Sequence, residues 1–145
     1  MFIQKSMACG ALVLILLAAG SGINVQAADN VDQGAAVAAA QAWLANIDKG
    51  NYGQGWKLAA SYLKANVQQK DFTRQLTGAR KPLGQLVSRK VLSKQELTSV
   101  PGGPDGHYVV IQFDSVFSQK KSAVETVTPM LEKDGKWRVS GYFIK

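Results

Sequence analysis

The sequence predicts an α+β domain in which two to three helices pack into a curved, four-stranded antiparallel sheet. Apolar residues recur at helical spacing over residues 31–80, whereas from Gly84 onward they alternate as they do in strands. Turn-forming residues divide this second half into four consecutive strand-like segments, which form an antiparallel meander. A strongly curved sheet of this kind can wrap around the long first helix as a cone whose open end leaves a pocket.

Residues 1–27 have the three parts of a secretory signal peptide. Lys5 supplies positive charge, residues 8–19 form an unbroken apolar run, and Val25-Gln26-Ala27 has the small-x-Ala form of a cleavage site. The apolar run is well below the ~20 residues that a membrane-spanning helix needs, so we expect no stable transmembrane anchor. The sequence therefore predicts a signal peptide at 1–27 and a single α+β domain at 28–145, periplasmic or secreted after cleavage near Ala27.

Cleavage would also change the chemistry that the chain can perform. It removes Cys9, the only cysteine, and so excludes disulfides, thiolate metal sites and cysteine nucleophiles from the mature protein. Loss of Lys5 lowers the formal net charge from +7 to +6. A basic exported domain favours acidic partners such as phospholipid headgroups, lipopolysaccharide or anionic metabolites. Nucleic acid is not expected as a partner, because the chain is exported and carries no nucleic-acid-binding motif.

Three helices are expected in the first half of the domain. The first has an apolar face made of Ala36, Ala40, Trp43, Leu44 and Ile47, and Gly50 ends it. Asn51 caps the second helix. Its stripe is formed by Tyr52, Trp56, Ala59, Ala60 and Leu63. A third helix over residues 69–79 ends before Pro82, because the residue that precedes a proline disfavours helical backbone.

Four strands are expected at residues 85–98, 107–118, 122–132 and 136–144. The turn residues 101–106 separate the first two, and Asp134-Gly135 is a strong hairpin signal between the last two. Pro129 interrupts the third strand, which predicts an edge position or a bulge that shifts the phase of the strand. In the last strand, alternation places Trp137, Val139 and Phe143 on one face.

Several blocks of sequence, in one order along the predicted domain, carry a resemblance to known proteins. They are 42–44, 47–52, Trp56, 80–84, 88–89, 101–106, 125–128 and the ending 134–142. The chain resembles a family of small bacterial exported proteins, the domain-of-unknown-function family 4019, and more broadly the nuclear transport factor two-like (cystatin-like) superfamily. The resemblance implies a cone-shaped, cystatin-like roll. It implies no single function, because the superfamily includes enzymes, ligand binders and dimerisation modules.

The sequence offers few groups for catalysis or metal binding. His107 is the only histidine and lies beside a glycine-rich turn, where a surface position is a better interpretation than a general base. One histidine without cysteines cannot form a typical zinc site, and no carboxylates have metal-ligand spacing. We therefore assign no catalytic residue and expect no cofactor or metal.

Glu125 is the most informative candidate for a ligand site. If Val127 faces the core, strand alternation puts Glu125 on the same face, where a carboxylate is costly to bury unless it is paired. Arginine can hold a carboxylate through two hydrogen bonds. The candidate partners are Arg80, Arg89 and Arg138. Two interpretations remain open: a structural ion pair, or a pocket that binds a polar or anionic ligand or uses Glu125 as an acid or base. A phase shift at Pro129 would instead turn Glu125 outward.

Aromatic and aliphatic residues on the sheet add further candidates. Trp137, like Trp43 and Trp56, fits an apolar stripe and belongs either to the core or to the mouth of a pocket. The second face of the sheet carries apolar residues that would mark an interface: Tyr108, Val110, Val116, Tyr142 and Ile144. Homodimers are common in the superfamily that the chain resembles, which makes a homodimer one of the expected partners.

Three functions follow from these observations. The first is a non-catalytic exported domain that binds a small ligand or envelope component. The second is a homodimeric or hetero-partner interaction module that uses the outer face of the sheet. The third is an isomerase-like or hydrolase-like enzyme that uses Glu125, and the thin set of acid and base groups makes it the weakest of the three.

Overall fold

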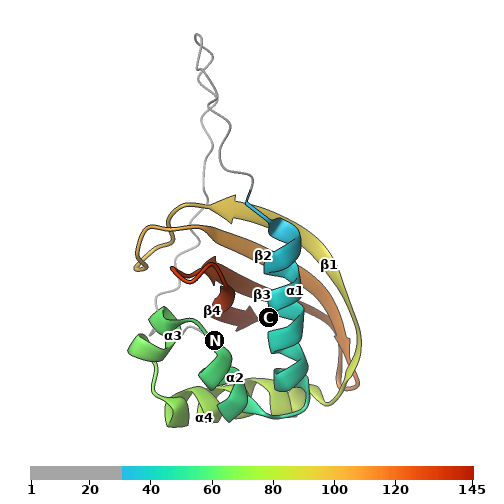
Figure 1. Ribbon diagram of the computed structural model, residues 1–145. Helices are drawn as coiled ribbons and strands as arrows, with labels where there is room; N and C mark the ends of the chain where they lie inside the picture. Colours follow the sequence, from blue (N-terminus) through green and yellow to red (C-terminus); the bar gives the residue numbers. More distant parts are fainter. Residues whose placement is uncertain (1–30) are drawn as a thin grey trace.

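The computed structural model describes residues 31–145, and the predicted signal peptide lies outside these residues (Figure 1). The helices are α1 (Gln33–Asp48), α2 (Tyr52–Leu58), α3 (Ser61–Asn66) and α4 (Gln69–Arg80), and a 3-10 turn follows at Lys81–Leu83. The strands are β1 (Leu86–Leu97), β2 (Tyr108–Phe117), β3 (Lys120–Leu131) and β4 (Trp137–Ile144). They form one antiparallel sheet in the order β1-β2-β3-β4. The predicted α+β fold is confirmed.

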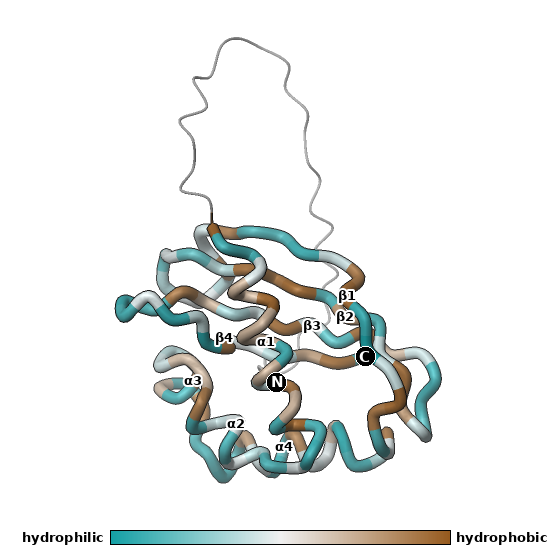
Figure 2. The backbone as a smooth tube through the Cα atoms, turned by 45° about the vertical axis from the view of Figure 1, so that its right-hand side comes forward, coloured by the Kyte–Doolittle hydropathy of each residue, from teal (hydrophilic) through white to brown (hydrophobic). Residues whose placement is uncertain are grey.

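The sheet curves around α1, and α2, α3 and α4 gather at one end of it (Figure 1). Helix α1 packs on β3 and β4, while α2 packs against α4. The core lies between the helices and the concave face of the sheet. Strand β1 forms one edge, and Figure 2 shows hydrophilic and apolar stretches alternating along it. No helix within residues 31–145 is long and apolar enough to cross a membrane.

Both ends of α1 follow from local chemistry. Asp32 caps the N-terminus, where its carboxylate accepts a hydrogen bond of 2.9 Å from the Ala35 backbone N–H. At the other end Gly50 has a φ of +77°, and its N–H donates to Ile47 O at 3.0 Å. The five apolar residues predicted for the buried face of this helix are all buried.

The predicted second helix is instead two short helices, α2 and α3. Ala59 and Ala60 between them have extended backbone, and the Ala60 N–H donates to Val139 O of β4 at 2.8 Å. This bond to the sheet edge replaces a bond within the helix. The prediction of one continuous helix was wrong because a tertiary contact overrides local helical spacing.

Trp43 of α1 organises the contact between the helices and the sheet. Its indole N–H donates to Gly55 O at 2.8 Å. The centroid of its ring lies 6.3 Å from the centroid of the Phe72 ring and 5.4 Å from that of the Tyr142 ring. Gly55 permits this close approach of α2 to α1, because a Cβ there would lie 2.6 Å from Ile47 Cδ1. Trp43 is therefore a core residue.

Strand β4 contains a bulge that the sequence analysis did not predict, and this bulge changes which residues of the strand face the core. Thr128 pairs with Gly141 and Pro129 pairs with Val139, so Ser140 is an extra residue without a partner. Pro129 lies opposite this bulge, but β3 is an internal strand whose alternation continues through Pro129, so the predicted edge position and the predicted phase shift of the third strand were both wrong. After the bulge, each residue of β4 faces the side of the sheet opposite to the one that simple alternation predicts. Tyr142 is therefore buried, Ile144 packs on the core, and Phe143 is 52% exposed.

The outer face of the sheet thus differs from the predicted set of five residues. Tyr142 and Ile144 belong to the inner side for the reason just given. Tyr108 is fully buried, and its hydroxyl donates to Pro104 O at 2.5 Å, so the β1–β2 loop covers it. Val110 and Val116 remain on the outer face, where they are half-buried.

Candidate functional site

Glu125, Arg80 and Arg89 meet in the interior, as the sequence predicted. Glu125 of β3 is 0% exposed and points toward the helices, like Val127. Arg89 of β1 donates from Nε to Glu125 Oε1 at 2.7 Å, and Arg80 Nη1 at the end of α4 lies 3.7 Å from Glu125 Oε2. The carboxylate thus joins the middle of the sheet to the end of α4.

Asp48 at the end of α1 completes this cluster, and the sequence analysis missed it. Its Oδ1 accepts from Arg80 Nη2 at 2.7 Å and from Arg89 Nη2 at 2.9 Å. Its Oδ2 accepts from Arg89 Nη1 at 2.7 Å, so Arg89 holds Asp48 at two points and Glu125 at a third. Two carboxylates against two guanidinium groups make the cluster electrically neutral. The charge balance could have pointed to Asp48 in the sequence. Two arginines that face one buried glutamate leave an uncompensated positive charge, and a second carboxylate neutralises it.

Two hydroxyl groups occupy the remaining positions around Glu125. Ser115 donates to Oε1 at 2.6 Å, and Tyr142 donates to Oε2 at 2.5 Å. Burial, followed by the charge of Glu125, raises the pKa of Tyr142 well above its ordinary value of 10. The phenol therefore remains protonated and remains a donor. Both Glu125 oxygens are engaged, and this residue lines neither of the two cavities described below.

The electrostatics of the cluster favour the charged forms of Asp48 and Arg89. Burial alone would raise the pKa of Asp48, but the hydrogen bonds and charges of Arg89 and Arg80 outweigh it and hold this pKa below the ordinary value. Burial likewise works to lower the pKa of Arg89, and Asp48 and Glu125 reverse that effect and raise it. The Arg80 guanidinium also lies 4.8 Å from the centre of the Phe117 ring, a cation–π contact.

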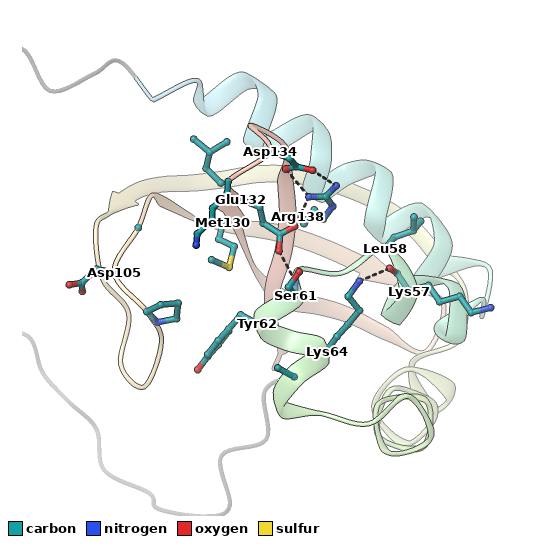
Figure 3. Close-up of a pocket in the computed structure, with 15 residues that line it drawn as sticks. Lys57, Leu58, Ser61, Tyr62, Lys64, Asp105, Met130, Glu132, Asp134 and Arg138 are labelled. Atoms are coloured by element: carbon teal, nitrogen blue, oxygen red, sulfur yellow. Dashed lines mark hydrogen bonds and ion pairs between the residues drawn. The ribbon is translucent and has the colours of Figure 1, made fainter.

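An open groove lies beside α3 (Figure 3). It has a volume of about 970 Å³ and runs between α2 and α3, the β1–β2 loop and the β3–β4 turn. Its apolar lining consists of Leu58, Ala65, Pro104, Met130 and Leu131, with Tyr62 beside them. Tyr62 donates to Gly102 O at 2.6 Å, which connects α3 to the β1–β2 loop across the groove.

Arg138 lines this groove and does not join Glu125. It forms ion pairs with Glu132 and with Asp134, the latter at 2.8 Å. Hydrogen bonding to Arg138 lowers the pKa of Asp134 to about 2. Glu132 also accepts a hydrogen bond of 2.7 Å from the Ser61 N–H, so it fixes the first residue of α3 to the end of β3. Arg138 therefore shapes the groove wall through the β3–β4 turn.

The charges on the groove are unevenly paired. Arg138 neutralises Glu132 and Asp134, whereas Lys57, Lys64 and Lys133 form no ion pair among residues 31–145. Lys64 Nζ donates only to Lys57 O, at 3.2 Å. Asp105 is the one further acidic residue of the lining. The groove thus combines an apolar surface with an excess of unpaired ammonium groups.

The remaining predicted residues lie outside the groove. Trp137 is half-buried and packs against the core. His107 is exposed before β2. In the described part of the chain, no three histidine, cysteine, aspartate or glutamate residues lie close enough to hold a metal ion.

Comparisons with known proteins identify a family. No curated protein and no solved structure matches the chain significantly, so the broader superfamily resemblance remains an expectation. A family model described as a protein of unknown function, DUF4019, matches residues 39–142. This match extends from the middle of α1 to the buried Tyr142 of β4, and so includes Asp48, Arg80, Arg89, Glu125 and the groove. The chain belongs to the DUF4019 family.

Proposed function

We propose that this protein is an exported, non-catalytic binding domain that holds a small amphipathic acid in the groove beside α3. This acid is either a free small molecule or a component of the cell envelope. The observation that carries the proposal is the pairing of an apolar lining with three lysines that have no carboxylate partner among residues 31–145. An alkyl chain would cover the apolar lining, and its acidic group would meet the ammonium groups at the rim.

The groove suits such a ligand in size and rigidity. About 970 Å³ is at the upper end of the volumes common for small-molecule sites. Its walls are held in place by the Glu132 bond to Ser61 and the Tyr62 bond to Gly102. A site that is already formed loses less conformational entropy when a ligand binds.

Catalysis by Glu125 has less support. A general base needs a free oxygen within hydrogen-bond reach of its substrate. The Glu125 oxygens are instead held by Arg89, Ser115 and Tyr142 in a fully buried position. Of the two interpretations of Glu125, a structural ion pair or a ligand pocket, we therefore adopt the structural ion pair. We propose that ligand binding takes place in the groove.

Calorimetric titration with dodecanoate, kept below its micellar concentration, tests the proposed function. We expect saturable binding of dodecanoate and at least tenfold weaker binding of dodecyltrimethylammonium, which has the same chain and the opposite charge. The double variant Lys57→Gln/Lys133→Gln removes two partly exposed ionic contacts and should weaken dodecanoate binding about tenfold.

The matched control is Lys70→Gln, which removes an exposed lysine outside the groove. It should leave dodecanoate affinity unchanged. Equal binding of the two detergents, or equal losses in the groove variant and the control, would contradict the proposed site.

Self-association through the outer sheet face is a second candidate function. Phe143 is 52% exposed on a face that also carries Val110 and Val116, and Figure 1 shows no helix over that side of the sheet. Sedimentation equilibrium should then detect a dimer that Phe143→Ser dissociates. A monomer at every concentration of the unsubstituted protein would exclude this candidate.

A further inference from the structure

We propose that a second, smaller cavity binds a small oxyanion such as a phosphate group. The cavity has a volume of about 350 Å³ and lies where α1 and α4 end. Its lining is formed by Ile47, Asp48, Lys49, Gly50, Tyr52, Thr77, Arg80, Lys81 and Gly84. None of these residues lines the groove beside α3, so the two sites are independent.

The lining has an excess of positive charge. Lys49 and Lys81 form no hydrogen bond or ion pair through their side chains within the described part of the chain. Asp48 is the only carboxylate of the lining, and Arg80 and Arg89 already neutralise it. An incoming anion would therefore meet two unpaired ammonium groups in a lining that also contains the Arg80 guanidinium. Concave sites lined by one sign of charge concentrate ions of the other sign.

Two further donors in the lining are unused. The Tyr52 hydroxyl makes no hydrogen bond within residues 31–145. Arg80, which is only 4% exposed, has a buried Nε without a hydrogen-bond partner. Phosphate oxygens accept hydrogen bonds from amines, hydroxyls and guanidinium groups alike. The two ammonium groups and the Tyr52 hydroxyl are thus the donors that the lining offers to an oxyanion, and the largely buried Arg80 adds positive charge.

The buried charge cluster positions the two lysines. Lys49 directly follows Asp48, and Lys81 directly follows Arg80. The bond of 2.7 Å between Arg80 Nη2 and Asp48 Oδ1 holds the ends of α1 and α4 together, and so brings both lysines to one cavity. The positive φ angles of Gly50 and Gly84 then turn the chain away on both sides.

The helix ends limit the affinity that we expect. The carboxyl end of a helix carries partial negative charge, which opposes an anion. Bonds from Gly50 N to Ile47 O and from Gly84 N to Lys81 O satisfy part of that charge. We therefore expect a dissociation constant on the order of 1 mM for inorganic phosphate, equivalent to about 4 kcal/mol of binding free energy.

NMR titration of the purified protein with inorganic phosphate, at constant ionic strength with chloride as the reference anion, tests this site. Saturable shifts are expected at the amides of Lys49, Gly50, Lys81 and Gly84. Lys49→Gln/Lys81→Gln should weaken phosphate binding about tenfold, and Tyr52→Phe about threefold, through loss of exposed ionic contacts and one hydrogen bond. The substituted lysines are exposed and their side chains form no hydrogen bond or ion pair within residues 31–145, so folding should be unchanged.

Control variants separate this proposal from the groove. Lys57→Gln/Lys133→Gln should leave phosphate binding intact, whereas Lys49→Gln/Lys81→Gln should leave dodecanoate binding intact. Methyl phosphate in place of phosphate tests whether an esterified phosphate also fits, and acetate tests whether one negative charge suffices. Shifts that grow linearly without saturation, or that persist unchanged in Lys49→Gln/Lys81→Gln, would overturn the proposed anion site.

Discussion

Arg89 of β1 donates two hydrogen bonds to Asp48 of α1, with nitrogen–oxygen distances of 2.7 and 2.9 Å, and its Nε donates a third to Glu125 of β3. One side chain at the sheet edge thereby connects the end of the first helix to the centre of the sheet. Arg80 closes the same network from α4. The network is a buried polar link between the helical layer and the sheet, and the first predictions concern it.

Replacing Asp48 by asparagine should destabilise the fold strongly. The change leaves two largely buried guanidinium groups with a single carboxylate, and breaking a buried ion pair in this way costs about 3–5 kcal/mol. Urea unfolding measures the loss in free energy of unfolding. Asp71→Asn is the matched control, because it breaks the exposed pair with Arg74 and should cost about 0.5 kcal/mol or less. Similar losses in both variants would argue against a structural role for the network.

Removing the Tyr142 hydroxyl should leave Glu125 Oε2 short of a donor. Tyr142→Phe keeps the ring against Trp43 but deletes the hydrogen bond of 2.5 Å, at an expected cost of about 1–3 kcal/mol. Tyr52→Phe makes the same chemical change at a hydroxyl that has no hydrogen bond in the described structure, and its stability should be unchanged. Thermal unfolding followed by circular dichroism compares the two, and equal midpoints would contradict the assigned hydrogen bond.

Acidification should destabilise the protein below about pH 4. The pKa of Asp48 is held below its ordinary value of 3.8, and that of Asp134 is lowered to about 2. Groups whose pKa is lower in the folded state stabilise the fold above their unfolded pKa, and this contribution is lost as the pH falls through the folded pKa. Urea unfolding between pH 7 and pH 2 should show this loss, with a smaller pH dependence in Asp48→Asn. An unchanged pH dependence in that variant would show that Asp48 does not contribute.

Two glycines in helices should respond oppositely to alanine. Gly55→Ala would place a Cβ 2.6 Å from Ile47 Cδ1, where overpacking costs about 1–3 kcal/mol. Gly78→Ala in α4 meets no atom within 4 Å and should stabilise the protein by about 0.5–1 kcal/mol through helix propensity. Urea unfolding distinguishes them. Stabilisation by Gly55→Ala would contradict the close packing of α1 and α2.

Export should be accompanied by cleavage after Ala27. We expect intact-mass spectrometry of the protein recovered from outside the cytoplasm to show a chain that starts at Ala28 and lacks Cys9. Substituting Ala27 by a large residue such as tryptophan should block cleavage, because the cleavage site requires small residues. Recovery of the uncleaved chain only from the cytoplasm would contradict the proposed export.

The fold could be predicted well from the sequence because its periodic patterns are local. The face of α1 and the alternation along β2 and β3 follow directly from the spacing of apolar residues. The break between α2 and α3 could not be predicted, because it depends on the Ala60 bond to β4. The bulge at Ser140 likewise depends on how two strands pair, and it exchanged the predicted positions of Tyr142 and Phe143.

The candidate site was only partly predictable. Glu125 and its arginines followed from strand phase and from the need to pair a buried charge, and Asp48 was missed because it appears on the polar side of a helical pattern. Arg138 was assigned to the wrong carboxylate, since the tight turn brings Asp134 to it. The groove joins residues from α2, α3, the β1–β2 loop and the β3–β4 turn, which no local pattern connects.

The most direct test of the central claim is to map dodecanoate on the protein by NMR. The account predicts saturable amide shifts concentrated at α3, at residues 104–106 and at the β3–β4 turn, with Arg80, Arg89 and Glu125 unaffected. Shifts concentrated on the outer sheet face, or saturable shifts at the buried cluster with none in the groove, would contradict it.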